Sequence, residues 1–580
     1  MCRERDSRRD DAGWRLWSVA RYGSMAAVSR AALALLFSLL HFWVLDHRST
    51  AQEAPPRLVE RIPEAALALL PDQRETQHTL VLPERTLRFR ATAGALAIAN
   101  AERSIQADVA FIAYAREGVA GANRPVIFAF NGGPGSASVW LHLGTIGPWH
   151  VPLTSETVSN SGKPVIAANP DTWLDFADLV FIDPPGTGYS AVWLPSRGAG
   201  PATGMYKDPV MPVVRRDRRG SPNGAVRPLG GRNVGGPDWF WSVEGDVVTF
   251  AEVIDGWLER YGRKNAPIVI VGESYGGFRT PLIAERLSSV HSRRVSAMVL
   301  VSPVLDFDGR RGWRTPQHYV ALLPSIAATA WERGGAEPTR SLLAAAENYA
   351  SGDYLVDLMR GPRDKAAVGR MSQRVANLSR IPIDTIDKLG ARLTIQTFVD
   401  NSPQLANQVV SLYDAGMSGL VQPQRRGRGG FSDPFTSGLN APLTAAMDVV
   451  HERLGWQPAR PYVMLAGDVN RRWLWPNTPH APEALAVLSD LHRNQPQLRT
   501  LVVHGFTDLV TPYFASVTQL AQLPSHGPEN RISLEVYAGG HMFYSRNDSR
   551  SRFRSATERM IGDALGFGNK KPNGETGETP

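Results

Sequence analysis

An apolar run at residues 267–271 (Pro-Ile-Val-Ile-Val) leads directly into Gly-Glu-Ser-Tyr-Gly-Gly at 272–277. The run has the length and β-branched composition of a buried strand, and Phe278 to Leu287 continue as a helix. Between a strand and a helix, Gly-x-Ser-x-Gly makes a turn so tight that only small residues fit beside the serine, which leaves its hydroxyl exposed. The sequence therefore predicts an α/β fold in which a central strand presents Ser274.

The motif alone is weak, because glycine makes up 53 of the 580 residues and a glycine-rich turn can carry a serine without using it. Two later segments strengthen it. Residues 499–504 read as a buried strand and lead to Asp508, while 532–537 read as another and lead to His541. A nucleophilic serine in this kind of fold needs an orienting acid and then a base from later strands, in that order along the chain.

Two other histidines compete for the role of base. His504 lies at the end of a predicted strand, where packing or a loop hydrogen bond is the expected role. His526 lies in Pro-Ser-His-Gly-Pro, a surface-loop composition that no strand precedes. We therefore expect His541 to be the base.

An upstream segment has the pattern needed to stabilise an oxyanion. Residues 125–130 (Pro-Val-Ile-Phe-Ala-Phe) read as a strand that opens into Asn-Gly-Gly-Pro-Gly-Ser at 131–136. A tetrahedral intermediate needs one backbone N–H after the nucleophile and another from an early strand-to-helix loop. Tyr275 suits the first, and a glycine at 132–133 the second.

Taken together, the motifs of the chain resemble those of the serine carboxypeptidase family. Six motifs occur in the family's order across roughly residues 125–545: Asn-Gly-Gly-Pro-Gly (131–135), Asn-Pro-Asp-Thr-Trp (169–173), Leu-Val-Phe-Ile-Asp-Pro-Pro-Gly-Thr-Gly-Tyr-Ser (179–190), Gly-Glu-Ser-Tyr-Gly (272–276), the Asp508 loop, and Gly-His-Met (540–542).

The resemblance implies an α/β-hydrolase fold, with a central mostly parallel sheet flanked by helices and an inserted helical lid. It implies Ser274 as nucleophile, His541 as base and Asp508 as the residue that orients the base. The N–H groups of Gly133 and Tyr275 would form the oxyanion hole.

The resemblance also implies a role for the acid beside the nucleophile. In the family, the equivalents of Asn131, the Gly132 N–H and Glu273 hold the terminal carboxylate of the substrate. Two ionised carboxylates would repel each other, so one of the pair must carry a proton. We therefore expect exopeptidase binding to be best at acidic pH.

The sequence departs from the family pattern at two positions. Thr145 stands where family members commonly carry a second glutamate, which would weaken carboxylate recognition or change how it is built. Ser136 replaces the usual cysteine. Because Cys2 is the only cysteine in the chain and no metal-binding spacing of histidines or cysteines occurs, we expect no disulfide, metal or cofactor.

Residues 1–51 have the features of a secretory signal peptide. Arginine-rich residues precede an apolar stretch at 31–45, and small residues follow at 49–51. The stretch is short for a membrane span of ~20 residues, so we expect cleavage, export to the periplasm or medium, and no stable membrane insertion. The alternatives are an uncleaved anchor or a disordered tail. A start at Met25 would shorten the signal to 27 residues.

The net charge of +8 comes from two segments. Residues 1–51 contain eight basic and five acidic groups, and residues 191–238 contain eight basic and three acidic groups. The rest is neutral, which argues against a nucleic-acid partner. Residues 191–238 are also rich in glycine and proline, so we expect a flexible insert.

Helical periodicity dominates 315–454 and predicts the lid. The catalytic core then comprises 52–314 and 455–565, and the polar tail 566–580 is expected to be disordered. Of the aromatic residues in the lid (Tyr319, Trp331, Tyr349 and Tyr354), we expect most to pack in a core rather than line a pocket.

These observations predict a serine carboxypeptidase that acts on peptide or protein C-termini through an acyl-enzyme. An esterase or acyltransferase with the same triad is the alternative among enzymes, because the triad determines the acyl chemistry and the lid the substrate. A non-catalytic binding protein that keeps the fold is the remaining alternative. The sequence does not indicate an oligomeric state.

Overall fold

The computed structural model describes residues 70–99, 105–119, 124–153, 164–192, 239–308, 315–402, 408–420, 433–478, 480–527 and 531–566, all within one unit that spans 68–580. The predicted leader at 1–51, the insert from residue 193 and the tail from residue 567 lie outside the described residues. No helix within the described part of the chain is both long and apolar enough to cross a bilayer.

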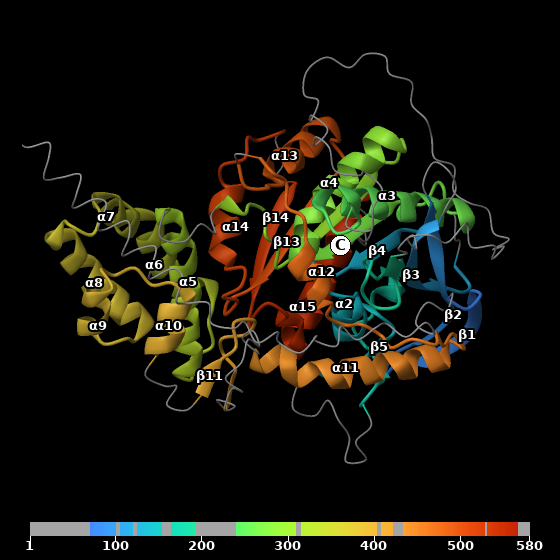
Figure 1. Ribbon diagram of the computed structural model, residues 1–580, viewed down its shortest axis with the longest axis horizontal. Coiled ribbons are helices and arrows are strands. Elements are labelled where there is room, and N and C mark those ends of the chain that lie inside the picture. Colours follow the sequence, from blue (N-terminus) through green and yellow to red (C-terminus); the bar gives the residue numbers. More distant parts are fainter. Residues whose placement is uncertain are drawn as a thin grey trace, which may run out of the picture. The chain divides into compact units, whose positions relative to one another are not determined.

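A ten-stranded sheet forms the centre of this unit (Figure 1). Its strand order is β1-β2-β3-β7-β4-β9-β10-β13-β14, with β8 paired to β3. The first three strands are antiparallel, and the six from β7 to β14 are parallel. The order from β2 onward is that of the α/β-hydrolase fold, which confirms the predicted fold class.

The strands of the sheet have these bounds: β1 Arg74–Val81, β2 Thr86–Ala99, β3 Ile105–Arg116, β4 Val126–Phe130, β7 Asp178–Ile182, β8 Ala191–Val192, β9 Ile268–Glu273, β10 Val295–Val301, β13 Arg499–Gly505 and β14 Ile532–Tyr537. Two short pairs lie outside it: β5 Trp149–His150 with β6 Ala167–Ala168, and β11 Gln408–Val410 with β12 Ser418–Leu420.

The central strands are buried on both faces, and their alternate side chains enter different cores. Ile127 and Ala129 of β4 lie in one apolar cluster, whereas Val126, Phe128 and Phe130 lie in another. Helices α11 (Pro434–Arg453) and α15 (Asn547–Ala564) contribute to the first cluster; α3 (Val243–Arg260), α4 (Tyr275–Val290) and α13 (Leu485–Asn494) contribute to the second. The sheet is therefore the middle of three layers, as expected when parallel strands are buried on both sides.

A helical segment between β10 and β13 forms a separate cluster. It contains α5 Pro316–Arg333, α6 Arg340–Tyr349, η7 Ala350–Tyr354, α7 Leu355–Arg360, α8 Lys365–Ser379, α9 Ile383–Lys388 and α10 Ile395–Asn401. All four aromatic residues named above belong to this cluster or pack against it. The cluster also contains Leu509 and Tyr513, the latter the first residue of α14 (Tyr513–Leu520), so it supports the segment that follows β13.

Helix α11 differs from the other helices in the predicted lid. Its residues Phe435, Leu439 and Leu443 pack in the core of the sheet rather than in the helical cluster. The remaining short helices are α2 Val139–Leu141, η2 His142–Ile146, η3 Trp173–Asp175, α12 Gly467–Arg472 and η9 Phe543–Ser545. The domain boundaries themselves stay a prediction.

Candidate active site

Ser274 lies between the last residue of β9 and the first residue of α4, with φ 61° and ψ −120°. This left-handed region costs a non-glycine residue roughly 1–3 kcal/mol. The turn leaves no room for flanking side chains, because a β-carbon on Gly272 would lie 2.1 Å from the carbonyl oxygen of Gly276. The Ser274 N–H donates to Val301 O at 2.8 Å, which ties the turn to β10. Ser274 itself is partly exposed, so a substrate can reach it.

His541 and Asp508 meet at the ends of β14 and β13. His541 Nδ1 lies 2.7 Å from Asp508 Oδ2, and both side chains are buried. The backbone N–H groups of Val510 and Thr511 donate to Asp508 Oδ1 at 2.8 and 2.9 Å. Because the carboxylate accepts at Nδ1, neutral His541 keeps its proton there, and Nε2 carries the lone pair that can accept a proton.

Two hydroxyl groups hold this pair in place. Thr511 Oγ1 lies 2.5 Å from Asp508 Oδ2 and 3.0 Å from His541 Nδ1. Ser302, at φ 44°, donates its hydroxyl to the carbonyl of His541 at 2.8 Å. Neither residue was predicted from the sequence. Thr511 had a signal, since it lies three residues after Asp508; Ser302 follows β10 with no motif of its own.

The competing histidines have other partners. His504 Nε2 lies 2.9 Å from Ser516 Oγ, and burial lowers the pKa of this histidine to about 4. His526 Nε2 lies 2.8 Å from Ser489 Oγ. Neither hydroxyl belongs to the turn at Ser274.

The loop after β4 packs directly on the serine turn. A β-carbon on Gly132 would lie 2.5 Å from Tyr275 N and 2.6 Å from Glu273 O, so glycine alone fits there. Gly133 follows with φ +99° and is exposed. Asn131 Oδ1 accepts from Leu141 N at 3.2 Å, which fixes the orientation of its amide.

Glu273 is buried beside Ser274 with two neutral partners. Tyr544 donates its hydroxyl to Glu273 Oε2 at 2.7 Å, and the Asn131 side chain is also hydrogen-bonded to this carboxyl. Burial raises the pKa of Glu273 to about 7, although His541, Tyr544 and Asn131 act in the opposite direction. Glu273 can therefore carry a proton at mildly acidic pH. No sequence motif pointed to Tyr544.

Thr145 lies in η2 and is fully buried. Among the described residues, its hydroxyl has no hydrogen-bond partner. Its carbonyl, like that of Gly147, accepts from Asn169 Nδ2, at 2.6 and 2.8 Å respectively. The Asn-Pro-Asp-Thr-Trp motif at 169–173 therefore holds the η2 turn in place.

A buried ion pair lies behind the serine turn. Arg279 of α4 and Asp246 of α3 are essentially inaccessible, with Nε and Oδ2 3.0 Å apart. The guanidinium carbon lies 4.9 Å from the ring centre of Tyr275 and 4.7 Å from that of Phe250. The pair thus supports the residue whose N–H is expected in the oxyanion hole. Arginine is so seldom fully buried that the sequence alone carried no signal for it.

Aromatic side chains surround Tyr275 on its other sides. Its ring centre lies 5.2 Å from that of Trp473 and 5.8 Å from that of Trp475, and Phe307 lies 4.7 Å from Trp475. Trp475 is 42% exposed. This wall offers an apolar surface close to the nucleophile.

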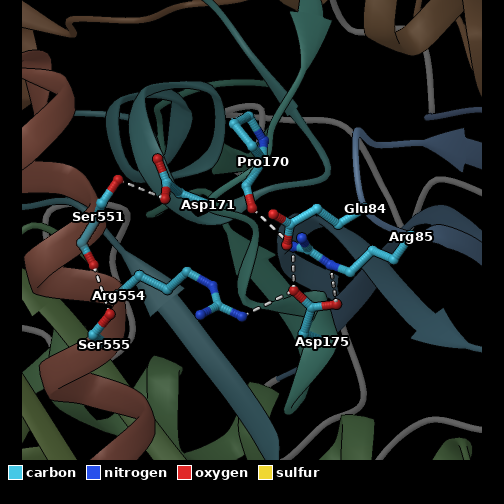
Figure 2. Close-up of a pocket in the computed structure, with 8 residues that line it drawn as sticks. All are labelled: Glu84, Arg85, Pro170, Asp171, Asp175, Ser551, Arg554 and Ser555. Carbon is cyan, nitrogen blue, oxygen red and sulfur yellow. Dashed lines mark hydrogen bonds and ion pairs between the residues drawn. The ribbon is translucent and has the colours of Figure 1, made fainter.

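A polar hollow of about 360 Å³ is lined by other residues than those of the candidate active site (Figure 2). Arg85 and Arg554 both point to Asp175 in Figure 2, at 2.5 and 2.9 Å. Asp171 accepts from Ser551 at 2.8 Å. The hollow is thus bordered by ion pairs that join the β1–β2 connection and η3 to α15.

Comparisons with known proteins agree with this geometry. A family model described as serine carboxypeptidase matches residues 85–306. A pheromone-processing carboxypeptidase KEX1 of Cryptococcus gattii is 44% identical over 66 residues, which is 11% of this chain and 9% of that relative. The aligned segment therefore spans less than a tenth of the length of the relative.

Solved structures are similar at lower identity. A prohormone-processing carboxypeptidase, Kex1(Δ)p of Saccharomyces cerevisiae, is 15% identical with a TM-score of 0.48, covering 82% of this chain and 91% of the other. A proline iminopeptidase of Mycobacterium smegmatis is 12% identical with a TM-score of 0.28, covering 84% and 99%. The family match covers the segment that carries Ser274, Glu273 and the Asn131 loop.

Proposed function

We propose that the protein is a serine-type carboxypeptidase that removes the C-terminal residue of a peptide or protein. One observation carries the proposal: next to Ser274 lies a buried carboxyl, Glu273, hydrogen-bonded to Asn131 and with a pKa raised to about 7. A protonated carboxyl and an amide can together bind a substrate carboxylate. A general esterase has no need of such a group.

The triad supplies the acyl chemistry. Ser274 attacks the last peptide carbonyl while His541 Nε2 takes its proton, and Asp508 stabilises the resulting imidazolium. The N–H groups of Gly133 and Tyr275 stabilise the oxyanion. His541 then protonates the departing amino acid, and water, activated by the same imidazole, hydrolyses the acyl-enzyme.

The terminal carboxylate of the substrate is held by Asn131, the Gly132 N–H and Glu273. The neutral form of Glu273 donates its proton to that carboxylate, whereas the ionised form repels it. Binding therefore weakens as pH rises through the pKa of Glu273, which makes the enzyme favour acidic to neutral pH.

Matched peptides test the proposal. The wild-type protein and Ser274→Ala are incubated with one peptide that has either a free or an amidated C-terminus, and the products are followed by mass spectrometry. We expect stepwise loss of residues from the free terminus only, and none with Ser274→Ala. Cleavage that ignores the state of the terminus would contradict a carboxypeptidase.

An esterase or acyltransferase is the second candidate. It is favoured by Thr145, which brings no carboxyl to the site where the family commonly has one. Turnover of acyl esters by the wild-type protein without any trimming of the free peptide would support it.

Three further parts of the proposal concern the rest of the chain. We assign α5–α10 the role of a lid, because this cluster packs against Leu509 and Tyr513 next to Asp508. Residues 1–51 are assigned as an export signal, with periplasmic or secreted location of the mature protein, and the predicted insert is shortened to 193–238, because Ala191 and Val192 form β8. N-terminal sequencing of the mature protein tests the signal; mature protein that begins at Met1 or Met25 would contradict cleavage.

A further inference from the structure

The partners of Glu273 come from elements far apart in the sequence. Tyr544, in η9, donates its hydroxyl to Oε2 at 2.7 Å, and Asn131, after β4, is hydrogen-bonded to the same carboxyl. The charged groups that act on Glu273 are His541 and Asp508. Its two hydrogen-bond partners among the described residues are therefore neutral, and Asp508 acts on it through its charge alone.

The position of the Tyr544 ring is built into the fold. A β-carbon on Gly144 would lie 2.8 Å from Tyr544 Cε2, so the ring fits only because residue 144 is glycine. The ring is fully buried, in the same apolar cluster as Phe543 and Leu143. Its hydroxyl cannot swing toward solvent without leaving this cluster. The neighbouring Thr145 hydroxyl, by contrast, is buried without a partner among the described residues.

We propose that Tyr544 is the positioning residue of the carboxylate site: its hydroxyl holds one oxygen of Glu273 and leaves the other to present a proton to the C-terminus of the substrate. This inference rests on the proposed function. The phenol of Tyr544 is a neutral donor supplied by η9, and its ring packs against Gly144 of η2, the residue beside Thr145.

The choice of a phenol has a consequence for pH dependence. A hydrogen bond donated to a carboxylate stabilises the ionised form and lowers the pKa, whereas a second carboxyl would raise it. Tyr544 thereby limits the pH range in which Glu273 carries its proton. The pKa of Glu273 nevertheless stays raised, at about 7, because burial outweighs the opposing effects of His541, Tyr544 and Asn131, and Asp508 adds to the rise.

The variant Tyr544→Phe isolates the hydroxyl, because it keeps the ring and its packing. The Glu273 pKa should rise, and the pH at which KM begins to increase for a free-carboxylate peptide should move upward by about one unit, since a hydrogen bond to a charged group is worth about tenfold or more. A residue that served only to pack the core would instead raise KM by the same factor at every pH.

Tyr537→Phe is the matched control. The Tyr537 hydroxyl donates to Glu535 at 2.5 Å on β14, a buried phenol on a carboxylate that is not part of the site. KM for the free peptide is measured from pH 5 to 9 for the wild type and both variants. An acyl ester without a carboxylate is assayed in parallel, so that damage to the triad or the fold is seen separately.

We expect the upward shift in Tyr544→Phe alone, and only with the free-carboxylate peptide. If the midpoint of the rise of KM with pH stays in place in Tyr544→Phe, or moves to lower pH, the role of Tyr544 is overturned. The proposed carboxypeptidase function is not affected by that outcome. A wild-type protein that treats free and amidated peptides alike overturns the proposed function and, with it, this inference.

Discussion

A β-carbon added to Gly132 would lie 2.5 Å from the backbone nitrogen of Tyr275. The loop after β4 and the start of α4 are therefore in direct backbone contact, and any side chain at residue 132 must separate them. Since Tyr275 and the neighbouring Gly133 supply the two N–H groups assigned to the oxyanion, their separation should act on the chemical step.

We predict that Gly132→Ala lowers kcat by about 10²–10³, the loss typical of one oxyanion donor. The reference variant is Gly369→Ala in α8, where an added β-carbon meets no atom within 4 Å. Steady-state kinetics on the free peptide compare the two. Equal activity in both variants would show that the loop contact does not serve catalysis.

The second prediction concerns the tautomer of His541. Asp508→Asn replaces the carboxylate that accepts from His541 Nδ1 with an amide that can donate to Nδ1. The imidazole proton then moves to Nε2, so His541 can no longer act as the base. We expect kcat to fall by about 10⁴ with little change in KM. Asp255→Asn is the control, because Asp255 also pairs with a histidine, His291, at 3.2 Å. A similar loss in both would point to unfolding instead.

The third prediction tests how Glu273 binds its ligand. Glutamine in its place is a permanent donor, so Glu273→Gln should give a KM that is flat from pH 5 to 9, whereas wild-type KM rises as pH passes about 7. Glu332→Gln is a suitable control, since Glu332 is a largely buried carboxyl paired with Arg546. If KM of Glu273→Gln still rises with pH, another group controls binding.

The same carboxyl affects stability. The folded pKa of Glu273, about 7, lies above its ordinary value of 4.5, so its favourable contribution is complete below pH 4.5 and is lost as pH rises through 7. The loss is about 3 kcal/mol at pH 8. Urea unfolding should show the free energy of unfolding of Glu273→Gln increasing, relative to that of the wild type, by an amount of that order between pH 5 and 8. A difference between the two proteins that does not change with pH would contradict the raised pKa.

Local patterns predicted much of this architecture. The predicted strands at 125–130, 267–271, 499–504 and 532–537 all appear in the sheet, because buried parallel strands read as continuous apolar runs. The sequence order of Asp508 and His541 after successive strands was enough to predict that they meet, since parallel strands deliver their ends to one edge.

Other features needed the three-dimensional structure. The antiparallel strands β1–β3 were not predicted, and α11 has the same helical periodicity as the lid helices although it packs on the sheet. The Tyr544–Glu273 hydrogen bond joins residues 271 positions apart. A tyrosine in a short helix carries no periodic signal for such a contact.

The buried ion pair of Arg279 and Asp246 gives the last prediction. Burial raises the pKa of Asp246 to about 7 even though Arg279 lowers it. Without the guanidinium, the pKa of Asp246 in the folded protein rises further. The stability of the variant therefore continues to fall with pH above the wild-type pKa of Asp246, where the stability of the wild type no longer changes through this group. We expect Arg279→Met to cost about 3–5 kcal/mol when Asp246 is left as an uncompensated charge, and more at pH 8.5 than at pH 6.

The double variant Arg279→Met/Asp246→Asn separates charge from packing. Removing the second charge should recover part of the loss at pH 8.5 and little of it at pH 6, where Asp246 in the single variant is already protonated. Urea unfolding at both pH values measures this. A double variant no more stable than the single one at pH 8.5 would mean that the arginine acts by filling space under Tyr275 and Phe250, and that its charge contributes nothing.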